Sequence, residues 1–324
     1  TPLSGTTTLG IGNGNNRPTL KITYVTVPPC AGIPETGNTL ASVAGACVGT
    51  PFTLSFSETI PGGGLTFQWQ RADDAAFSVN LTNLGTSTTQ SATQSSPKYY
   101  RCIATCPSSG PSKDTSTPLF LTMSPNYLCT CSSFPNSSSD EDIFNVTFGS
   151  LNNSSNCSTL ASGIGSIAQI YSKYRNLTAP AVEQQSVVPF SVQIGTCGTG
   201  SYPNRTAIFI DYNQNGSFSD AGELVYSSPG GLPPGAHTET GTITIPATAN
   251  TGFCAMRVIT SEQAGAITNP CLLYSWGETE DYVINITPFT ICSGTPNPGN
   301  TISNLATVCS GSTANLTLQN LTTG

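Results

Sequence analysis

Residues 98–106 read KYYRCIATC, and this stretch decides the fold of its half of the chain. Tyr100 stands two residues before Cys102, which is the spacing of the tyrosine corner and second core cysteine of an immunoglobulin domain. The same pattern requires an earlier cysteine followed by a tryptophan, and Cys47 and Trp69 hold those places. We therefore expect an immunoglobulin-like sandwich in which a Cys47–Cys102 disulfide joins the two sheets and packs against Trp69.

Two more cysteines flank this module, and we expect Cys30 and Cys106 to pair near one end of the sandwich. Closing a loop as long as the one between Cys47 and Cys102 would stabilise the fold by about 4 kcal/mol in the chain-entropy model. The loops 57–64 and 83–96 concentrate neither aromatic nor charged residues. A spacer is therefore favoured over a binding face.

The start of this module is repeated near the end of the chain. Residues 30–56 and 292–318 share the pattern C-x-G-x-P-x-x-G-N-T, and in both copies a second cysteine follows 17 residues after the first. Such self-similarity is the signature of a tandem array. We expect four parts: residues 1–28, the last strands of a preceding module; 29–124, the immunoglobulin-like sandwich; 125–288, a second sandwich; and 289–324, the start of another immunoglobulin-like repeat.

Composition predicts an all-β protein made of tandem, disulfide-stapled β-sandwich modules. Charged residues make up only 8% of the 324 residues, while Thr, Ser, Asn and Gly, which suit strands and turns, dominate. The net charge is −7 and no basic cluster occurs, so nucleic acid is not an expected partner. No apolar run is long enough to span a membrane. The chain begins without Met, and we interpret it as part of a longer polypeptide.

The cysteines predict disulfides in an oxidising, extracellular setting, because their spacing does not match zinc sites and the chain has a single histidine. In the middle module we expect a Cys254–Cys271 bridge. Cys129 or Cys131 would pair with Cys157, and Cys197 would take the remaining partner. The expected disulfide cysteines are Cys30, Cys47, Cys102, Cys106, Cys129, Cys131, Cys157, Cys197, Cys254, Cys271, Cys292 and Cys309.

Residues 211–223, DYNQNGSFSDAGE, resemble a calcium-binding loop. The candidate ligands are Asp211, Asn213 and Asn215 at positions 1, 3 and 5, the Ser217 carbonyl at position 7, and Asp220 or Glu223 to complete the shell. Gly216 at position 6 would allow the sharp turn. The match then ends, because position 12 is Gly222. The alternative is an Asx-rich hairpin turn without metal, and calcium is the favoured interpretation.

A second acidic motif, residues 276–282, reads WGETEDY. Glu278, Glu280 and Asp281 are reserve calcium ligands, or they line a sugar site with the neighbouring aromatic residues. Alternatively the aromatic residues belong to the core and the acids cap a turn before the final strand, which is the favoured interpretation.

The sequence offers little support for catalysis, and we expect no enzyme and no catalytic residue. His237 lies in the segment LPPGAHTETG, which we interpret as a mobile loop, and neither a G-x-S-x-G elbow nor a Cys–His pair in a supporting context occurs. Paired carboxylates for glycoside hydrolysis would have to come from the 278–281 cluster, where neighbouring side chains point to opposite faces of a strand.

The middle module resembles the GEVED domain of secreted Bacteroidota proteins. The resemblance rests on the segments 143–157, 207–226, 241–258 and 276–286. The motif that names the family appears as Gly277 to Asp281, with Thr279 in place of Val. It implies a β-sandwich in extracellular proteins exported by the type IX route, among them adhesins, gliding-motility adhesins and non-catalytic parts of hydrolases. It implies no activity.

We therefore expect a structural, adhesive segment of a large repetitive protein at the bacterial cell surface. Its partners would be neighbouring modules of the same chain, the type IX export machinery, and glycans or surfaces. The alternative is a set of carbohydrate-binding accessory modules of a secreted hydrolase, for which a row of exposed aromatic side chains near Trp276 would be the sign.

Overall fold

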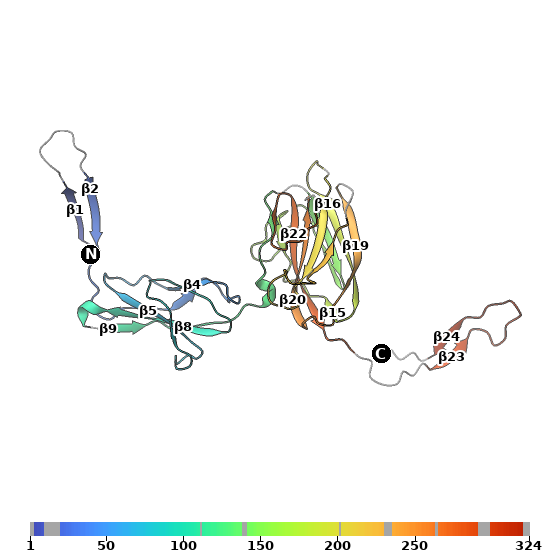
Figure 1. Cartoon of the computed structure of the whole chain (residues 1–324), viewed down its shortest axis with the longest axis horizontal. Coiled ribbons are helices and arrows are strands. Elements are labelled where there is room, and N and C mark those ends of the chain that lie inside the picture. Colours follow the sequence, from blue (N-terminus) through green and yellow to red (C-terminus); the bar gives the residue numbers. More distant parts are fainter. Residues whose placement is uncertain are drawn as a thin grey trace. The chain divides into compact units, whose positions relative to one another are not determined.

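The computed structural model describes residues 3–9, 20–110, 112–137, 141–200, 202–229, 235–262, 265–290 and 299–319, with side chains from residue 27 onward. The chain divides into two compact units, Thr1–Thr130 and Cys131–Gly324. Within the described residues, only two short 3-10 turns, Pro107–Ser109 and Asn126–Leu128, interrupt an all-β structure (Figure 1). The described residues contain no helix long and apolar enough to cross a bilayer. The tandem, disulfide-stapled β-sandwich fold predicted from the sequence is confirmed.

The first unit holds a sandwich of two antiparallel sheets. One sheet has the order β3 (Thr39–Ala41), β4 (Phe52–Phe56), β7 (Gln90–Ala92). The other has the order β10 (Leu119–Leu121), β8 (Lys98–Cys106), β5 (Thr66–Ala72), β6 (Thr82–Asn83), and β9 (Ser112–Thr115) also pairs with β8. Trp69 and Tyr100 are fully buried between the sheets, and the Tyr100 hydroxyl donates to Gln94 Oε1 at 3.0 Å. The hydroxyl thus bonds back to a residue six positions upstream, as in the expected tyrosine corner, but to a side chain where that motif uses the backbone.

The predicted Cys47–Cys102 bridge is wrong. Cys47 lies outside the strands, before β4, and is bonded to Cys129. The inward position of β4 is taken by Leu54, which is packed in the same buried cluster as Trp69 and Cys102. Cys102 is therefore a free thiol, and burial raises its pKa to about 12. The structure does pair Cys30 with Cys106, as expected.

Two hairpins stand at the ends of the chain. The first joins β1 (Leu3–Leu9) to β2 (Leu20–Thr26), and the second joins β23 (Asn300–Ser303) to β24 (Leu316–Gln319). The second has the register of β3–β4, since Ser303 pairs with Leu316 as Ala41 pairs with Leu54. Adding 262 to each number of the first pair gives the second. The sequence repeat is thus also a repeat of strand pairing.

The second unit is a larger sandwich. One antiparallel sheet has the order β13 (Leu151–Ser154), β12 (Glu141–Phe148), β16 (Val187–Thr196), β19 (His237–Thr244). The facing sheet has the order β14 (Tyr171–Lys173), β22 (Gly277–Thr287), β20 (Gly252–Ser261), β17 (Arg205–Ile210), β18 (Leu224–Ser227). The short strand β15 (Ala181–Glu183) also pairs with β22, and both it and β14 run parallel to it. A separate parallel pair joins β11 (Phe134–Pro135) to β21 (Leu273–Tyr274).

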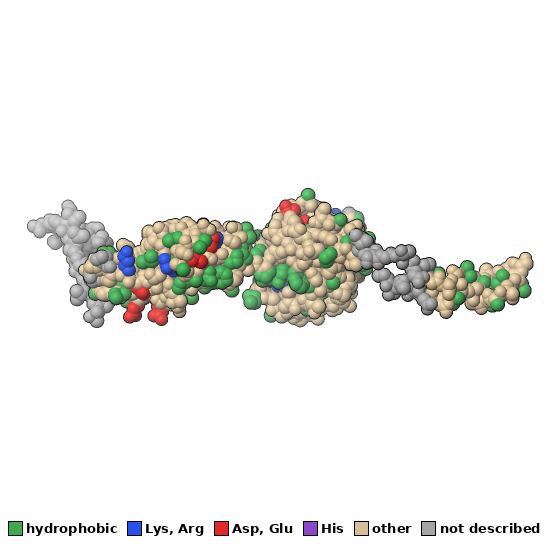
Figure 2. All heavy atoms as spheres, turned by 90° about the horizontal axis from the view of Figure 1, so that it is seen from below, with side chains coloured by type: hydrophobic (Ala, Val, Ile, Leu, Met, Phe, Trp, Pro, Cys, Tyr) green, Lys and Arg blue, Asp and Glu red, His purple; other side chains and the backbone are tan. Residues whose placement is uncertain are grey.

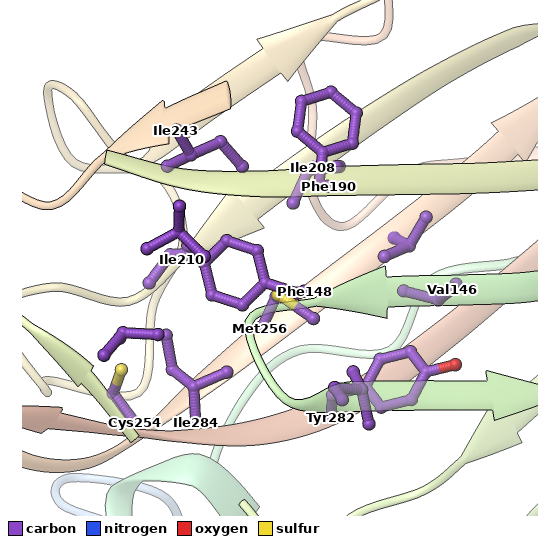
Figure 3. Close-up of a cluster of buried hydrophobic side chains, with 14 of the residues drawn as sticks. Val146, Phe148, Phe190, Ile208, Ile210, Ile243, Cys254, Met256, Tyr282 and Ile284 are labelled. Carbon is purple, nitrogen blue, oxygen red and sulfur yellow. The ribbon is translucent and has the colours of Figure 1, made fainter. Parts of the chain in front are cut away.

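The core of this unit lies between its two sheets. Figure 3 shows apolar side chains from several strands gathered there, including Phe148 of β12, Phe190 of β16 and Met256 of β20. Alternate residues of β16 point inward, as expected for a sheet with one solvated face. Strand β20 is buried almost throughout. Its second face must therefore also be covered.

The remaining disulfides differ from the predicted ones. Cys131 is bonded to Cys271, and Cys157 to Cys197. The predicted Cys254–Cys271 bridge is wrong because Cys254 points into the core, where it is a fully buried free thiol. The predicted pairing of Cys157 with Cys129 or Cys131 is wrong as well, since both of these have other partners.

Of the last two cysteines in the predicted disulfide set, Cys309 is an exposed free thiol. Cys292 lies outside the described residues.

Candidate functional site

The loop 211–223 connects β17 to β18, and its first acid folds it. Asp211 is fully buried. Its Oδ1 accepts a hydrogen bond from the Asn215 amide at 3.1 Å, and its Oδ2 accepts one from the Gly216 amide at 2.9 Å. Gly216 has a φ of +83°, a backbone conformation that glycine adopts without strain. The turn expected at position 6 is therefore present.

Successive polar side chains cap the rest of the loop. Asn213 Oδ1 accepts from the Asn215 amide at 3.0 Å, and Asn215 Oδ1 accepts from the Ser217 amide at 2.8 Å. The Asn215 side-chain amide donates to Asp220 Oδ2 at 2.9 Å. Each of these oxygens has two lone pairs, so it can accept from a local donor and still contact a second partner. The contacts alone are those of an Asx-rich turn, the alternative interpretation of this sequence.

Glu223 is the acid that closes the loop. Its side chain is almost fully buried, and its carboxylate accepts hydrogen bonds from the amides of Asn213, at 3.5 Å, and Asp220, at 3.3 Å. Burial raises the pKa of Glu223 to about 7, and the charges of Asp211 and Asp220 add to the rise. Burial also raises the pKa of Asp211. The loop thus gathers three carboxylates, Asp211, Asp220 and Glu223, whose negative charges repel one another.

The loop acids are not drawn tightly together. Within the described residues, the group whose acid, cysteine or histidine ligand atoms all lie within 4.8 Å of one another is Asp142, Cys157 and Cys197. Both cysteines of that group are in a disulfide and cannot bind metal as thiolates. In the loop, ligand atoms would have to move inward to surround an ion, with Asn213, Asn215 and the Ser217 carbonyl as the other oxygen donors.

The acids of the 276–282 motif lie within a strand, which corrects the expected turn. Strand β22 begins at Gly277, so the motif forms its first half and its side chains alternate between the two faces. Glu278, Glu280 and Asp281 are all buried. Glu278 and Glu280 face the inside of the sandwich, whereas Asp281 faces the outer, covered side of the sheet.

Asp281 is held by a buried arginine that the sequence analysis missed. Arg257 of β20 donates through Nε to Asp281 Oδ1 at 2.7 Å and through Nη2 to Oδ2 at 2.9 Å. The Tyr171 hydroxyl donates to the same carboxylate, and Arg175 forms a further ion pair with it. Burial alone would raise the pKa of Asp281, but the Arg257 guanidinium holds it below its ordinary value.

Arg257 also binds the segments that cover this face. It donates to the carbonyl oxygens of Pro270 and Cys131, both at 2.7 Å, and to the Tyr171 hydroxyl at 2.8 Å. These contacts surround the Cys131–Cys271 disulfide. A lone arginine within the apolar strand sequence CAMRVIT was the available signal, because a buried cation requires a partner.

Glu278 and Glu280 join the two sheets from inside, Glu280 by accepting from the hydroxyl of Ser155, just after β13, at 3.3 Å. Glu278 accepts from the Ile143 amide at 3.0 Å and from the Ser172 hydroxyl at 2.6 Å. Glu280 accepts from the Tyr282 hydroxyl at 2.6 Å. Burial raises the pKa of Glu280 to about 8, and burial together with the neighbouring carboxylates raises that of Glu278 well above its ordinary range. Both are therefore largely neutral at pH 7, which makes them structural acids rather than ready metal ligands.

The candidates for sugar binding and catalysis are separated in the structure. Trp276 is 44% exposed and lines a shallow cavity of about 240 Å³ with Glu262, Leu272 and Leu273. Tyr274 and Tyr282, the other aromatic residues of the motif, are buried. Of the aromatic residues in this motif, only Trp276 is therefore exposed, where the carbohydrate-binding alternative called for a row of them.

His237 begins strand β19, so the interpretation of this residue as part of a mobile loop is wrong. Its Nε2 lies 3.2 Å from Glu239 Oε1. Glu239 also accepts from the Ser228 hydroxyl. The serine thus contacts the acid, whereas a catalytic triad requires it to contact the histidine.

A match to a known protein family covers the part of the second unit that contains the acidic motif 276–282. Residues 205–285 match the GEVED domain. The matched span runs from β17 to β22, and it includes both the loop 211–223 and the Arg257–Asp281 pair. It covers less than half of the chain. No match was found among curated proteins.

Several solved structures are similar at low identity. The fibronectin(III)-like modules of Clostridium thermocellum CbhA are 10% identical, with 77% of this chain and 94% of that chain covered and a TM-score of 0.20. The chicken CNTN1 FN1-FN3 domains are 9% identical, with 85% and 75% covered and a TM-score of 0.23. The BSP domain of a biofilm associated protein is 11% identical, with 79% and 30% covered and a TM-score of 0.19.

Proposed function

We propose that this chain is a structural, adhesive segment of a large repetitive protein at the surface of a bacterium of the Bacteroidota type, exported by the type IX route. The observation that carries the proposal is the hairpin β23–β24, which repeats the strand register and the cysteine position of the first sandwich. A module that recurs with this precision belongs to a tandem array. Arrays of sandwich modules serve as spacers and adhesive stalks.

The coarser features of the structure are those of an extracellular, non-catalytic module protein. Its four disulfides are typical of a protein that folds in an oxidising, extracellular environment. The surface drawn in Figure 2 is mostly uncharged and polar, with few charged side chains and with apolar side chains gathered on parts of both units. Such a surface favours a long chain that stays soluble without binding its neighbours indiscriminately.

The experiment for adhesion uses the purified chain coupled to beads. Beads that carry it should resist shear on glass, on glycan-coated surfaces or on host-cell layers more than beads that carry an unrelated sandwich protein of equal charge. Equal detachment on every surface would contradict an adhesive role. A full-length polypeptide with no further copies of the cysteine-proline-glycine module would contradict the repetitive one.

Calcium is part of this proposal, with the loop 211–223 as its site. Asp211 and Glu223 are buried close enough for their charges to repel each other, and each accepts from two backbone amides. Asn213, Asn215 and the Ser217 carbonyl supply further oxygens, the ligand type that calcium takes. A bound ion would offset the repulsion between these carboxylates and stiffen the β17–β18 connection. It would hold a shape and perform no reaction.

The half-exposed Trp276 beside its shallow cavity supports the second candidate, a carbohydrate-binding module. Binding on a glycan array that disappears in Trp276→Ala, while the melting temperature stays unchanged, would favour this function. Absence of binding to any glycan on the array would contradict a carbohydrate-binding function.

A further inference from the structure

The disulfides are placed so that they bridge most of the chain between its two ends. Cys47 and Cys129 close a loop with a sequence separation of 82, and Cys131 and Cys271 close one of 140. The two bridges follow each other directly, because only Thr130 stands between Cys129 and Cys131. One of these cysteines is bonded within the first unit and the other within the second.

We propose that these bridges make the two units a nearly inextensible tether, which carries tension through covalent bonds even when the sandwiches unfold. The path of covalent bonds from Cys30 to Thr287 runs along the backbone to Cys47, crosses to Cys129, continues to Cys131, crosses to Cys271, and follows β22 to its end. This path contains 17, 2 and 16 backbone steps. Fully extended, it measures about 120 Å, whereas the same residues without disulfides would reach about 900 Å.

The first unit holds a second, overlapping bridge. Cys30–Cys106 encloses Cys47 within its loop, and Cys129 lies beyond that loop. Without the Cys47–Cys129 bond, the path would run through Cys30–Cys106 and then 23 residues to Cys129, only six more than before. Either bridge alone therefore keeps the first unit short. In the second unit Cys131–Cys271 acts alone, since Cys157–Cys197 lies wholly inside its loop.

Arg257 forms a buried hydrogen-bond network beside the Cys131–Cys271 bridge. This side chain is fully buried and binds the Cys131 carbonyl oxygen, the Pro270 carbonyl oxygen beside Cys271, and Asp281 of β22. The residues that would receive tension through the disulfide are thus anchored to the strand along which the chain leaves the unit. The claim that the chain carries tension rests on the proposed function, whereas its limited extension is a property of the molecule alone.

Single-molecule force spectroscopy on the full chain, held by tags at its two ends, tests the tether. Without reductant, we expect no unfolding event between Cys30 and Thr287 that releases more than about 120 Å of contour length. The double variant Cys131→Ser/Cys271→Ser should gain an event of about 340 Å, because it frees the 140-residue loop except for the 40 residues that Cys157–Cys197 still closes. The matched control Cys157→Ser/Cys197→Ser removes a disulfide of the same unit and should show no longer event than the wild type.

In the first unit, removal of either bridge should change the released length by about 20 Å or less, and removal of both should add about 280 Å. If the serine variants do not fold, the wild type held at constant force is treated with a phosphine reductant. Stepwise extension should follow, with a total of about 480 Å from the second unit and about 280 Å from the first once all four bridges are open. An event of hundreds of ångströms in the untreated wild type, or no step on reduction, overturns the tether. Limited extension in a chain that does not adhere would leave the tether in place and contradict the proposed function.

Discussion

Arg257 and Asp281 lie opposite each other on the neighbouring strands β20 and β22, joined by two hydrogen bonds of 2.7 and 2.9 Å. Both side chains are fully buried. The last acid of the motif 276–282 is thus one half of an ion pair that also fixes the segment around the Cys131–Cys271 disulfide. The motif Gly277 to Asp281, on which the resemblance to the GEVED family partly rests, is therefore a structural part of the sheet.

Loss of the negative charge of Asp281 should destabilise the second unit strongly. Asp281→Asn leaves the Arg257 guanidinium buried without its counter-charge, and we expect the free energy of unfolding to fall by about 3–5 kcal/mol at pH 7. Urea denaturation followed by circular dichroism measures it. Glu280→Gln is the matched control, because Glu280 lies on the same strand and is largely neutral at this pH. An equal decrease in the free energy of unfolding in the two variants would contradict a specific contribution of the ion pair to stability.

The stability of the second unit should decrease as the pH rises toward 8. Burial raises the pKa of Glu280 in the folded state to about 8, while the unfolded chain has an ordinary glutamate. Between these two values the folded state holds the proton and the unfolded state has lost it, so each increase in pH favours unfolding. Glu280→Gln should flatten this part of the curve. Thermal melts between pH 5 and pH 9 compare the two proteins, and parallel curves would contradict the assignment.

The corrected disulfides predict which thiols react. Cys102 and Cys254 are free and fully buried, and burial raises the pKa of Cys102 to about 12, so its thiolate is scarce at neutral pH. Both should resist iodoacetamide in the folded protein and react in guanidinium without reductant. Cys309 is exposed and free and should react in both states. Peptide mapping by mass spectrometry reads the result, and a Cys47–Cys102 or Cys254–Cys271 peptide would contradict the structure.

Calcium should raise the melting temperature of the second unit, and EDTA should reverse the rise. Asp211→Asn and Glu223→Gln each remove one buried charge from the loop and should abolish the response, which calorimetric titration with calcium checks directly. Asp74→Asn in the first unit is the control. Asp74 caps its own turn through the Ser78 and Val79 amides, both at 2.8 Å, in the manner of a metal-free Asx turn. A melting temperature that EDTA does not change would contradict calcium binding by this loop.

The sequence allowed the fold class and the tyrosine corner to be predicted because both depend on local pattern. Strand alternation and the Tyr-x-Cys spacing survive in any packing of these residues. The pairing of the cysteines does not follow from spacing, because Leu54 fills the core position that Cys47 was expected to occupy. Twelve cysteines have many possible pairings, and only the packed structure selects among them.

The candidate loop shows the same division. Its residue types and the turn at Gly216 were evident from the sequence, since glycine is the residue that adopts the positive φ of a sharp turn without strain. The burial of Glu223 was not, because it depends on how the β17–β18 connection folds back onto the sheet. Arg257 was overlooked for a related reason, since its partner Asp281 is 24 residues away and becomes its neighbour only when β20 pairs with β22.

The hairpin β23–β24 keeps the register of β3–β4 although Leu316 is 68% exposed where its counterpart Leu54 is fully buried. We therefore expect the short-range sequence of the repeat to align these two strands without help from the rest of the module. During synthesis, each module of this kind would leave the ribosome with its first two strands already matched. Contacts between residues close in the chain form fastest, so this early alignment would lower the chance that a strand pairs with the same strand of a neighbouring repeat.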